Sequence, residues 1–194
     1  MEKKLKATVA ELRDTYPDAH LRVWAEDEHR LGLQPIIRSV WVQQGYSPVA
    51  MVKPKYQGLW GVGVVEPVTG ETYWWLVPKL NTEVMNQLLG DFAEHFGVDE
   101  THRVLLVMDQ AGFHTSKDLK VPKGMHLLYL PPYSPELQPA ERLWSWTDEG
   151  MVNRHFDTLD ELEEVMVNRC QALMEQTDLI QGLTGFHWWL EALI

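Results

Sequence analysis

Three carboxylates stand where the predicted structural elements of this chain begin or end. Asp27 closes the alternating segment HLRVWAED, Asp109 closes the apolar run RVLLVMD, and Glu141 opens a helical pattern after a proline-rich turn. A charge at the end of a buried strand is costly unless it is paired or bound to a metal ion. Ligands of open α/β sheets also gather at such strand ends. The three acids are therefore candidates for one oxygen-rich site suited to Mg²⁺ and phosphoryl transfer.

Each acid also has a plain structural interpretation. Asp109 could belong to a simple turn, DQAG, and Glu141 could be a favourable acid near a helix N-terminus. Asp27 lies in EDEHR, which could be a solvated run of charges. Strand alternation places Asp27 on the core side and places Glu26 and Glu28 on the opposite side. Spacing alone leaves both interpretations open.

The elements that would position these acids indicate a mixed α/β fold. Strands are predicted over 20–27, 103–109 and 126–130, with two more around the turn PVTGE within 59–77 and a hairpin over 36–52. Helices are predicted over 2–15, over 82–96, from about 139 onward, and over 158–176. Thr158 and Glu161 fit a capping box for the last helix. Strands come first and then alternate with helices, so we expect a sheet with antiparallel early strands and parallel later strands, flanked by helices.

The helix over 82–96 has the clearest amphipathic pattern. We expect Thr82 to cap it and Gly97 to end it. The residues predicted on its buried face are Val84, Leu88, Leu89, Phe92 and Phe96.

Composition limits the class of protein. The chain has 194 residues, which suits a single domain over 1–194, and 45% of them are hydrophobic. We find no apolar run long enough to span a membrane and no secretory signal, and the one cysteine, Cys170, excludes an intrachain disulfide. These features predict a cytoplasmic protein. The net charge of −11 argues against an independent DNA-binding domain.

Three ordered motifs give a more specific indication. VWAEDEHRLGL, VLLVMDQAGFHTS and LPPYSPELQPAERLW together resemble the DDE transposases of the Tc/mariner superfamily, in particular its bacterial insertion-sequence branch. The resemblance extends from about residue 20 to residue 189. It implies an RNase H-like fold and DNA strand cleavage and transfer with Mg²⁺ or Mn²⁺, with two ions expected.

The resemblance also assigns residues. It places the catalytic, metal-binding acids at Asp27, Asp109 and Glu141, and a family histidine at His114. Further candidates for supporting or DNA-contacting roles are Glu28 and Arg142. The basic residues that could contact DNA are Arg30, Arg38, Lys53, Lys55, Lys117, Lys120 and Arg142.

Departures from the family pattern qualify these expectations. Gln110 and Gln138 stand where the family usually has asparagine, and about 20 residues precede the first strand, so the family's helix-turn-helix region is expected to be absent. We therefore expect the protein to act as a homodimer or larger oligomer that binds DNA, namely terminal repeats and target DNA. We also expect it to need a separate helix-turn-helix module. The alternatives are a non-catalytic remnant or partner subunit of a full transposase, and a glycosidase with paired carboxylates.

Overall fold

Five strands form one sheet in the order β3-β2-β1-β4-β5. The structure, a computed structural model, describes residues 1–39, 41, 43–45 and 57–194. The strands are β1 (His20–Gly32), β2 (Gly58–Glu66), β3 (Glu71–Val77), β4 (His102–Met108) and β5 (Met125–Tyr129). β1, β2 and β3 pair antiparallel, whereas β4 pairs parallel with β1 and with β5. The predicted mixed sheet, antiparallel early and parallel late, is confirmed.

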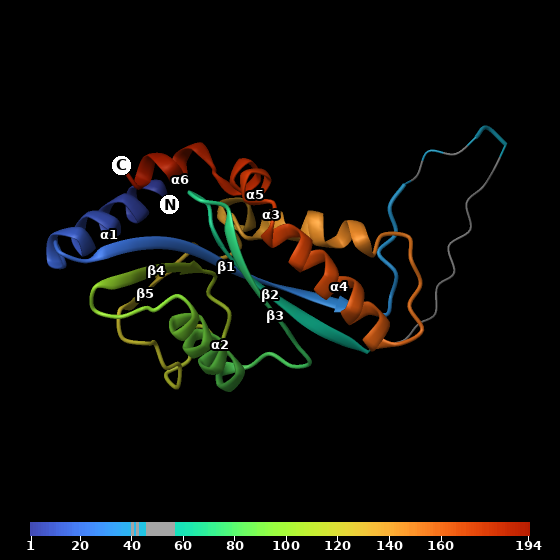
Figure 1. Ribbon diagram of the computed structural model, residues 1–194, viewed down its shortest axis with the longest axis horizontal. Coiled ribbons are helices and arrows are strands. Elements are labelled where there is room, and N and C mark those ends of the chain that lie inside the picture. Colours follow the sequence, from blue (N-terminus) through green and yellow to red (C-terminus); the bar gives the residue numbers. More distant parts are fainter. Residues whose placement is uncertain (40, 42, 46–56) are drawn as a thin grey trace.

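Helices cover both faces of the sheet (Figure 1). α2 (Thr82–His95) packs on one face, while the other face carries α1 (Glu2–Thr15), α3 (Glu141–Thr147), α4 (Leu159–Met174), α5 (Thr177–Thr184) and α6 (His187–Ala192). Two 3-10 turns, Pro135–Leu137 and Asp148–Gly150, flank α3. α1 lies beside α6, so the two ends of the chain are close together (Figure 1).

Strand alternation divides the core between these two layers. In β1, Val23 and Ala25 pack beneath α1 and the C-terminal helices, while Trp24 packs against α2. In β4, Leu105 packs on the side of α1 and the C-terminal helices, and Leu106 packs on the side of α2. Both faces are buried, which explains why the central strands have near-continuous apolar sequences.

The register of the two central strands aligns two of the candidate acids. β1 and β4 run parallel, and their last ladder pair is Ala25 with Val107. Two residues further along the chain stand Asp27, still within β1, and Asp109, the first residue after β4. Sheet pairing therefore brings these acids to one end of the sheet.

Several predicted boundaries differ from those observed. β1 continues past Asp27 to Gly32, because its second half pairs with β2 as far as Gly58. α3 begins at Glu141 rather than near Pro139, after the 3-10 turn. The predicted hairpin over 36–52 lies mostly outside the described residues, and residues 36–39 form no regular element.

The α2 predictions need two corrections. Asn81, not Thr82, is the N-cap, and its side chain accepts a hydrogen bond from the Val84 backbone. Val84 itself is half-buried, and Met85 takes its expected place in the core. Asparagine and threonine both cap helices, so the choice depends on which residue has the extended backbone of a cap.

Candidate active site

All three candidate acids line one cavity of about 450 Å³. Asp27 comes from the middle of β1, Asp109 directly follows β4, and Glu141 is the first residue of α3. The segment from Leu130 to Pro135 forms another wall. Elements that are distant in sequence thus present three carboxylates to one solvent-accessible space.

Two glutamine side chains fix the proline-rich segment that leads to Glu141. Gln138 is buried, and its Nε2 donates to the backbone oxygen of Glu26 at 2.7 Å. Gln110 Nε2 donates to the backbone oxygen of Leu130, also at 2.7 Å. Each amide joins this segment to a strand that carries an acid, or to the loop after one. The glutamines that depart from the family pattern therefore have a structural use here.

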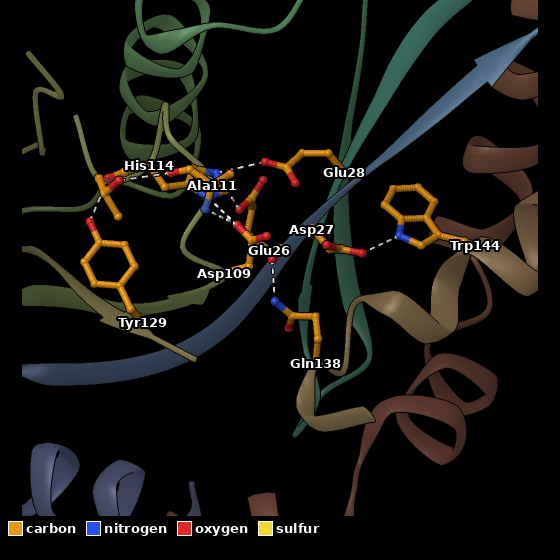
Figure 2. A network of polar contacts seen from close by, with 10 residues as sticks. Glu26, Asp27, Glu28, Asp109, Ala111, His114, Tyr129, Gln138 and Trp144 are labelled. Atoms are coloured by element: carbon orange, nitrogen blue, oxygen red, sulfur yellow. Dashed lines mark hydrogen bonds and ion pairs between the residues drawn. The ribbon is translucent and has the colours of Figure 1, made fainter. Parts of the chain in front are cut away.

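Trp144 holds the Asp27 carboxylate from α3. Its indole Nε1 donates to Asp27 Oδ2 at 2.6 Å, and Figure 2 shows Asp27 turned toward this indole. The ring also stacks on His29, with centroids 5.1 Å apart. Trp144 and Glu141 are three residues apart, so one helix face carries both groups to Asp27. Sequence reasoning missed Trp144, although this helical spacing was a usable signal.

Asp27 has an unfavourable electrostatic environment. Burial, followed by a hydrogen bond with Glu141 and the Glu141 charge, raises the pKa of Asp27 to about 9, although the bond from Trp144 acts in the opposite direction. The causes that raise the pKa of Asp27 are burial and neighbouring carboxylates, so its ionised form is disfavoured in the absence of a cation. A divalent cation would supply the compensating positive charge, so the donor set fits a hard metal ion that binds through oxygen.

A buried ion-pair cluster lies next to this cavity, on the α2 side of the sheet. His114 Nδ1 is 2.9 Å from Asp109 Oδ1, while its Nε2 is 2.9 Å from Glu28 Oε1 and 3.3 Å from Glu26 Oε2. Figure 2 shows the imidazole among these carboxylates. Both His114 and Glu26 are 1% exposed. The charged run EDEHR is therefore not a solvated surface segment.

The imidazole ring of His114 occupies the centre of this cluster as a cation. Burial alone would lower the pKa of His114, but Glu26, Asp109 and Glu28 together raise it to about 10. Burial and Glu28 raise the pKa of Glu26 well above its ordinary value. The donor atoms of Glu26, Glu28 and His114 lie within 4.8 Å of one another, close enough to share a metal ion. Because His114 already supplies a positive charge, we interpret the cluster as an ion pair.

This cluster orients Asp109. The hydrogen bond from His114 and another from the Ala111 backbone, at 2.8 Å, both reach Asp109 Oδ1 and lower the pKa of this carboxyl. The His114 loop is held in turn by Tyr129, whose hydroxyl donates to the His114 backbone oxygen at 2.8 Å. Asp109 is thus kept ionised in a fixed orientation. Sequence reasoning missed Glu26, which lies beneath α2 on the same face as the buried Trp24.

The other candidate residues are placed differently. Arg142 is exposed, and its guanidinium lies 5.3 Å from the centre of the Phe186 ring, outside the residues that line the acid cavity. Arg38 pairs with Asp148 at 3.3 Å. Lys53 and Lys55 are outside the described residues. Among the helices of the described ranges, we find none with both the length and the apolar character needed to cross a bilayer.

Comparisons with known proteins show which family and which relatives this chain resembles. A family model described as DDE superfamily endonuclease matches residues 22–163. An uncharacterized protein, y4pE/y4sA, of Sinorhizobium fredii (strain NBRC 101917 / NGR234) is 37% identical over 127 residues, which cover 65% of this chain and 93% of that protein.

Solved structures of Mos1 share the fold. A pre-cleavage Mos1 transpososome aligns with a TM-score of 0.60 and 12% sequence identity over 99% of this chain. A mariner Mos1 paired end complex with Mg aligns with a TM-score of 0.58 and 17% sequence identity, also over 99% of this chain. The chain spans 60% and 61% of the lengths of those Mos1 chains. The mixed sheet flanked by helices thus matches an RNase H-like fold, as predicted.

Proposed function

Because this chain belongs to the DDE superfamily endonucleases, we propose that its acid cavity cleaves DNA strands and joins them to new DNA, as the catalytic core of a transposase. The observation that carries the proposal is the convergence of Asp27, Asp109 and Glu141 on one cavity. Solved structures of Mos1, which shares the fold, include a paired end complex and a strand transfer complex.

The three acids are proposed to hold divalent metal ions. Mos1 paired end complexes are described with Mg and with Mn, and we extend these metals, with two ions, to this chain. Such ions activate the attacking oxygen and stabilise the leaving oxygen in phosphoryl transfer. The roles of this chain's own residues follow from their contacts: Trp144 orients Asp27, His114 orients Asp109, and the two glutamines hold the segment before Glu141.

The proposed substrate is DNA at transposon ends, followed by target DNA. Joining two ends to one target requires at least two active sites, so we propose a homodimer or larger oligomer. Within the part of the chain that the structure describes, no lysine or arginine lines the acid cavity, and the chain carries a net charge of −11. A separate helix-turn-helix module is therefore proposed to supply most of the DNA affinity.

A nicking assay tests this function. The full chain is mixed with DNA bearing terminal inverted repeats, a helix-turn-helix protein is supplied in trans, and products are resolved with Mg²⁺, Mn²⁺ or EDTA. We expect metal-dependent nicking that Asp27→Asn, Asp109→Asn or Glu141→Gln each abolishes, together with strand joining, because the acids share the metal ions. Glu136→Gln is the matched control, since Glu136 lies in the same segment but does not line the cavity.

The same assay separates the catalytic proposal from its alternative, a non-catalytic partner subunit. A partner subunit would bind a full transposase without nicking DNA under any metal condition. Equal nicking by wild-type protein and any one acid variant would remove that acid from the site. Binding of Mn²⁺ to the isolated chain, measured by titration calorimetry, provides a second readout that does not require the DNA-binding module.

A further inference from the structure

Tyr133 is an exposed aromatic residue at the rim of the acid cavity. It lines the same cavity as the three acids, yet its relative exposure is 102%. Its neighbours in the sequence PPYSP are prolines and a serine. Large aromatic side chains usually bury much of their surface. A fully exposed ring beside a charged cavity is therefore a feature that packing does not account for.

The backbone at Tyr133 has an uncommon conformation. Tyr133 has φ of 56°, in the left-handed region that residues with bulky side chains rarely adopt. Pro131, Pro132 and Pro135 restrict the chain on both sides. Such uncommon conformations cluster at functional sites, where the surrounding structure enforces them. The segment is thus built to present the ring outward rather than to bury it.

We infer that the ring of Tyr133 stacks on a nucleobase of the DNA strand held at the acids. This inference rests on the proposed function. A phosphodiester bound at the acid cavity places the bases of the adjoining nucleotides near the cavity rim, where Tyr133 lies. Every nucleobase has a π-face, so stacking suits a site that must accept more than one sequence. Because the flanking prolines already restrict the backbone, binding would order less of the chain at this position.

Stacking also compensates for the chain's charge. A net charge of −11 repels DNA at long range, and the described residues that line the cavity include no lysine or arginine. A contact through the face of an uncharged ring adds affinity without requiring a positive side chain. Tyr133 would therefore fix one base, and with it the register of the scissile phosphate relative to the acids.

Fluorescence of 2-aminopurine tests the inference on the full chain. The probe is an oligonucleotide with this base at successive positions around the expected nick, in buffer with Ca²⁺, and each sample is checked for intact DNA afterwards. We expect quenching at one position with wild-type protein, and the same with Tyr133→Phe. With Tyr133→Ala and Tyr133→Leu we expect affinity to fall by at least about fivefold, the lower range for loss of one stacked base. Trp41→Ala is the control, because Trp41 is equally exposed, at 104%, but does not line the cavity.

A second probe with an abasic nucleotide at the quenched position completes the test. If Tyr133 stacks on that base, removing the base and removing the ring cause losses that do not add. Equal quenching by wild-type and Tyr133→Ala protein, no quenching at any position, or additive losses would overturn the inference. Quenching that does not depend on Ca²⁺ would instead count against the metal site. Failure of the proposed function can therefore be distinguished from failure of the stacking inference.

Discussion

At the scale of single residues, Asp27 links the proposed metal site to the stability of the fold. Burial and Glu141 raise its pKa from 3.8 to about 9. A carboxyl whose pKa is higher in the folded state favours folding while it is protonated, and that contribution is lost as pH rises toward the folded-state pKa. In the absence of metal ions, Asp27 therefore lowers the stability of the fold progressively between about pH 4 and pH 9.

We expect Asp27→Asn to remove this part of the pH dependence. In urea unfolding with EDTA, the variant should gain stability relative to wild type, and the gain should be larger at about pH 8.5 than at about pH 5. Glu136→Gln, a change at an exposed acid, should show no such trend. An equal difference at both pH values would mean that Asp27 titrates normally in the folded chain.

The His114 cluster makes a different prediction. His114→Ala leaves Glu26 and Glu28 buried without the imidazole that faces them at 3.3 Å and 2.9 Å. Removing one partner of a buried ion pair costs about 3–5 kcal/mol of unfolding free energy. Urea unfolding would measure the loss, with His187→Ala as a control at an exposed ion pair. A loss below about 1 kcal/mol, the range of surface pairs, would contradict the assigned role.

At the scale of elements, α3 carries both an acid and the group that orients another acid. Trp144→Phe keeps most of the packing but removes the N–H that contacts Asp27 at 2.6 Å. Loss of a supporting hydrogen bond at a metal site typically costs 10–100-fold in metal affinity. We expect a decrease of about this size in Mn²⁺ affinity by calorimetry, with little change in the unfolding midpoint. Trp146→Phe, on the same helix, is the control, and unchanged Mn²⁺ affinity in Trp144→Phe would exclude the positioning role.

β2 leaves space for that indole through its glycines. Gly63 pairs with Asp27 across the ladder, and a Cβ at this position would lie 2.9 Å from the Trp74 ring and 3.1 Å from the Trp144 ring. Gly63→Ala should therefore destabilise the fold by about 1–3 kcal/mol through overpacking. Gly90→Ala is the control, because nothing lies within 4 Å of its Cβ in α2, and it should stabilise the fold by about 0.5–1 kcal/mol. Thermal unfolding of both variants would show whether their effects have opposite signs.

At the scale of the whole molecule, charge governs DNA binding. With a net charge of −11, the chain alone should bind duplex DNA weakly, and Mn²⁺ should strengthen binding by neutralising the acid cavity. Fluorescence anisotropy with and without EDTA should show this gain in wild type and not in Asp109→Asn. The affinity should also decrease as salt increases, because contacts with phosphates release counterions. Tight binding that requires no metal and resists salt would contradict this prediction.

Local sequence patterns predicted much of the fold and the three candidate acids. Alternating and continuous apolar runs predicted the strands, and their order predicted the mixed sheet, because periodicity reports which faces are buried. The three motifs identified Asp27, Asp109 and Glu141 before any geometry was known. Boundaries were less well determined. EDEHR suggests a surface segment, yet β1 continues through it, because its backbone pairs with β2 and its carboxylates contact His114 and Trp144.

Contacts between distant residues were decided by the tertiary structure alone. Trp144 meets Asp27 across 117 positions, and His114 meets Glu26 and Glu28 from another loop. No periodicity encodes such pairs, since they depend on how the elements pack. The exposure of Tyr133 and the raised pKa of Asp27 have the same origin, because burial and neighbouring charges exist only once the chain is folded. The sequence determined which groups are available for the proposed chemistry, and the tertiary structure decided how each is oriented and charged.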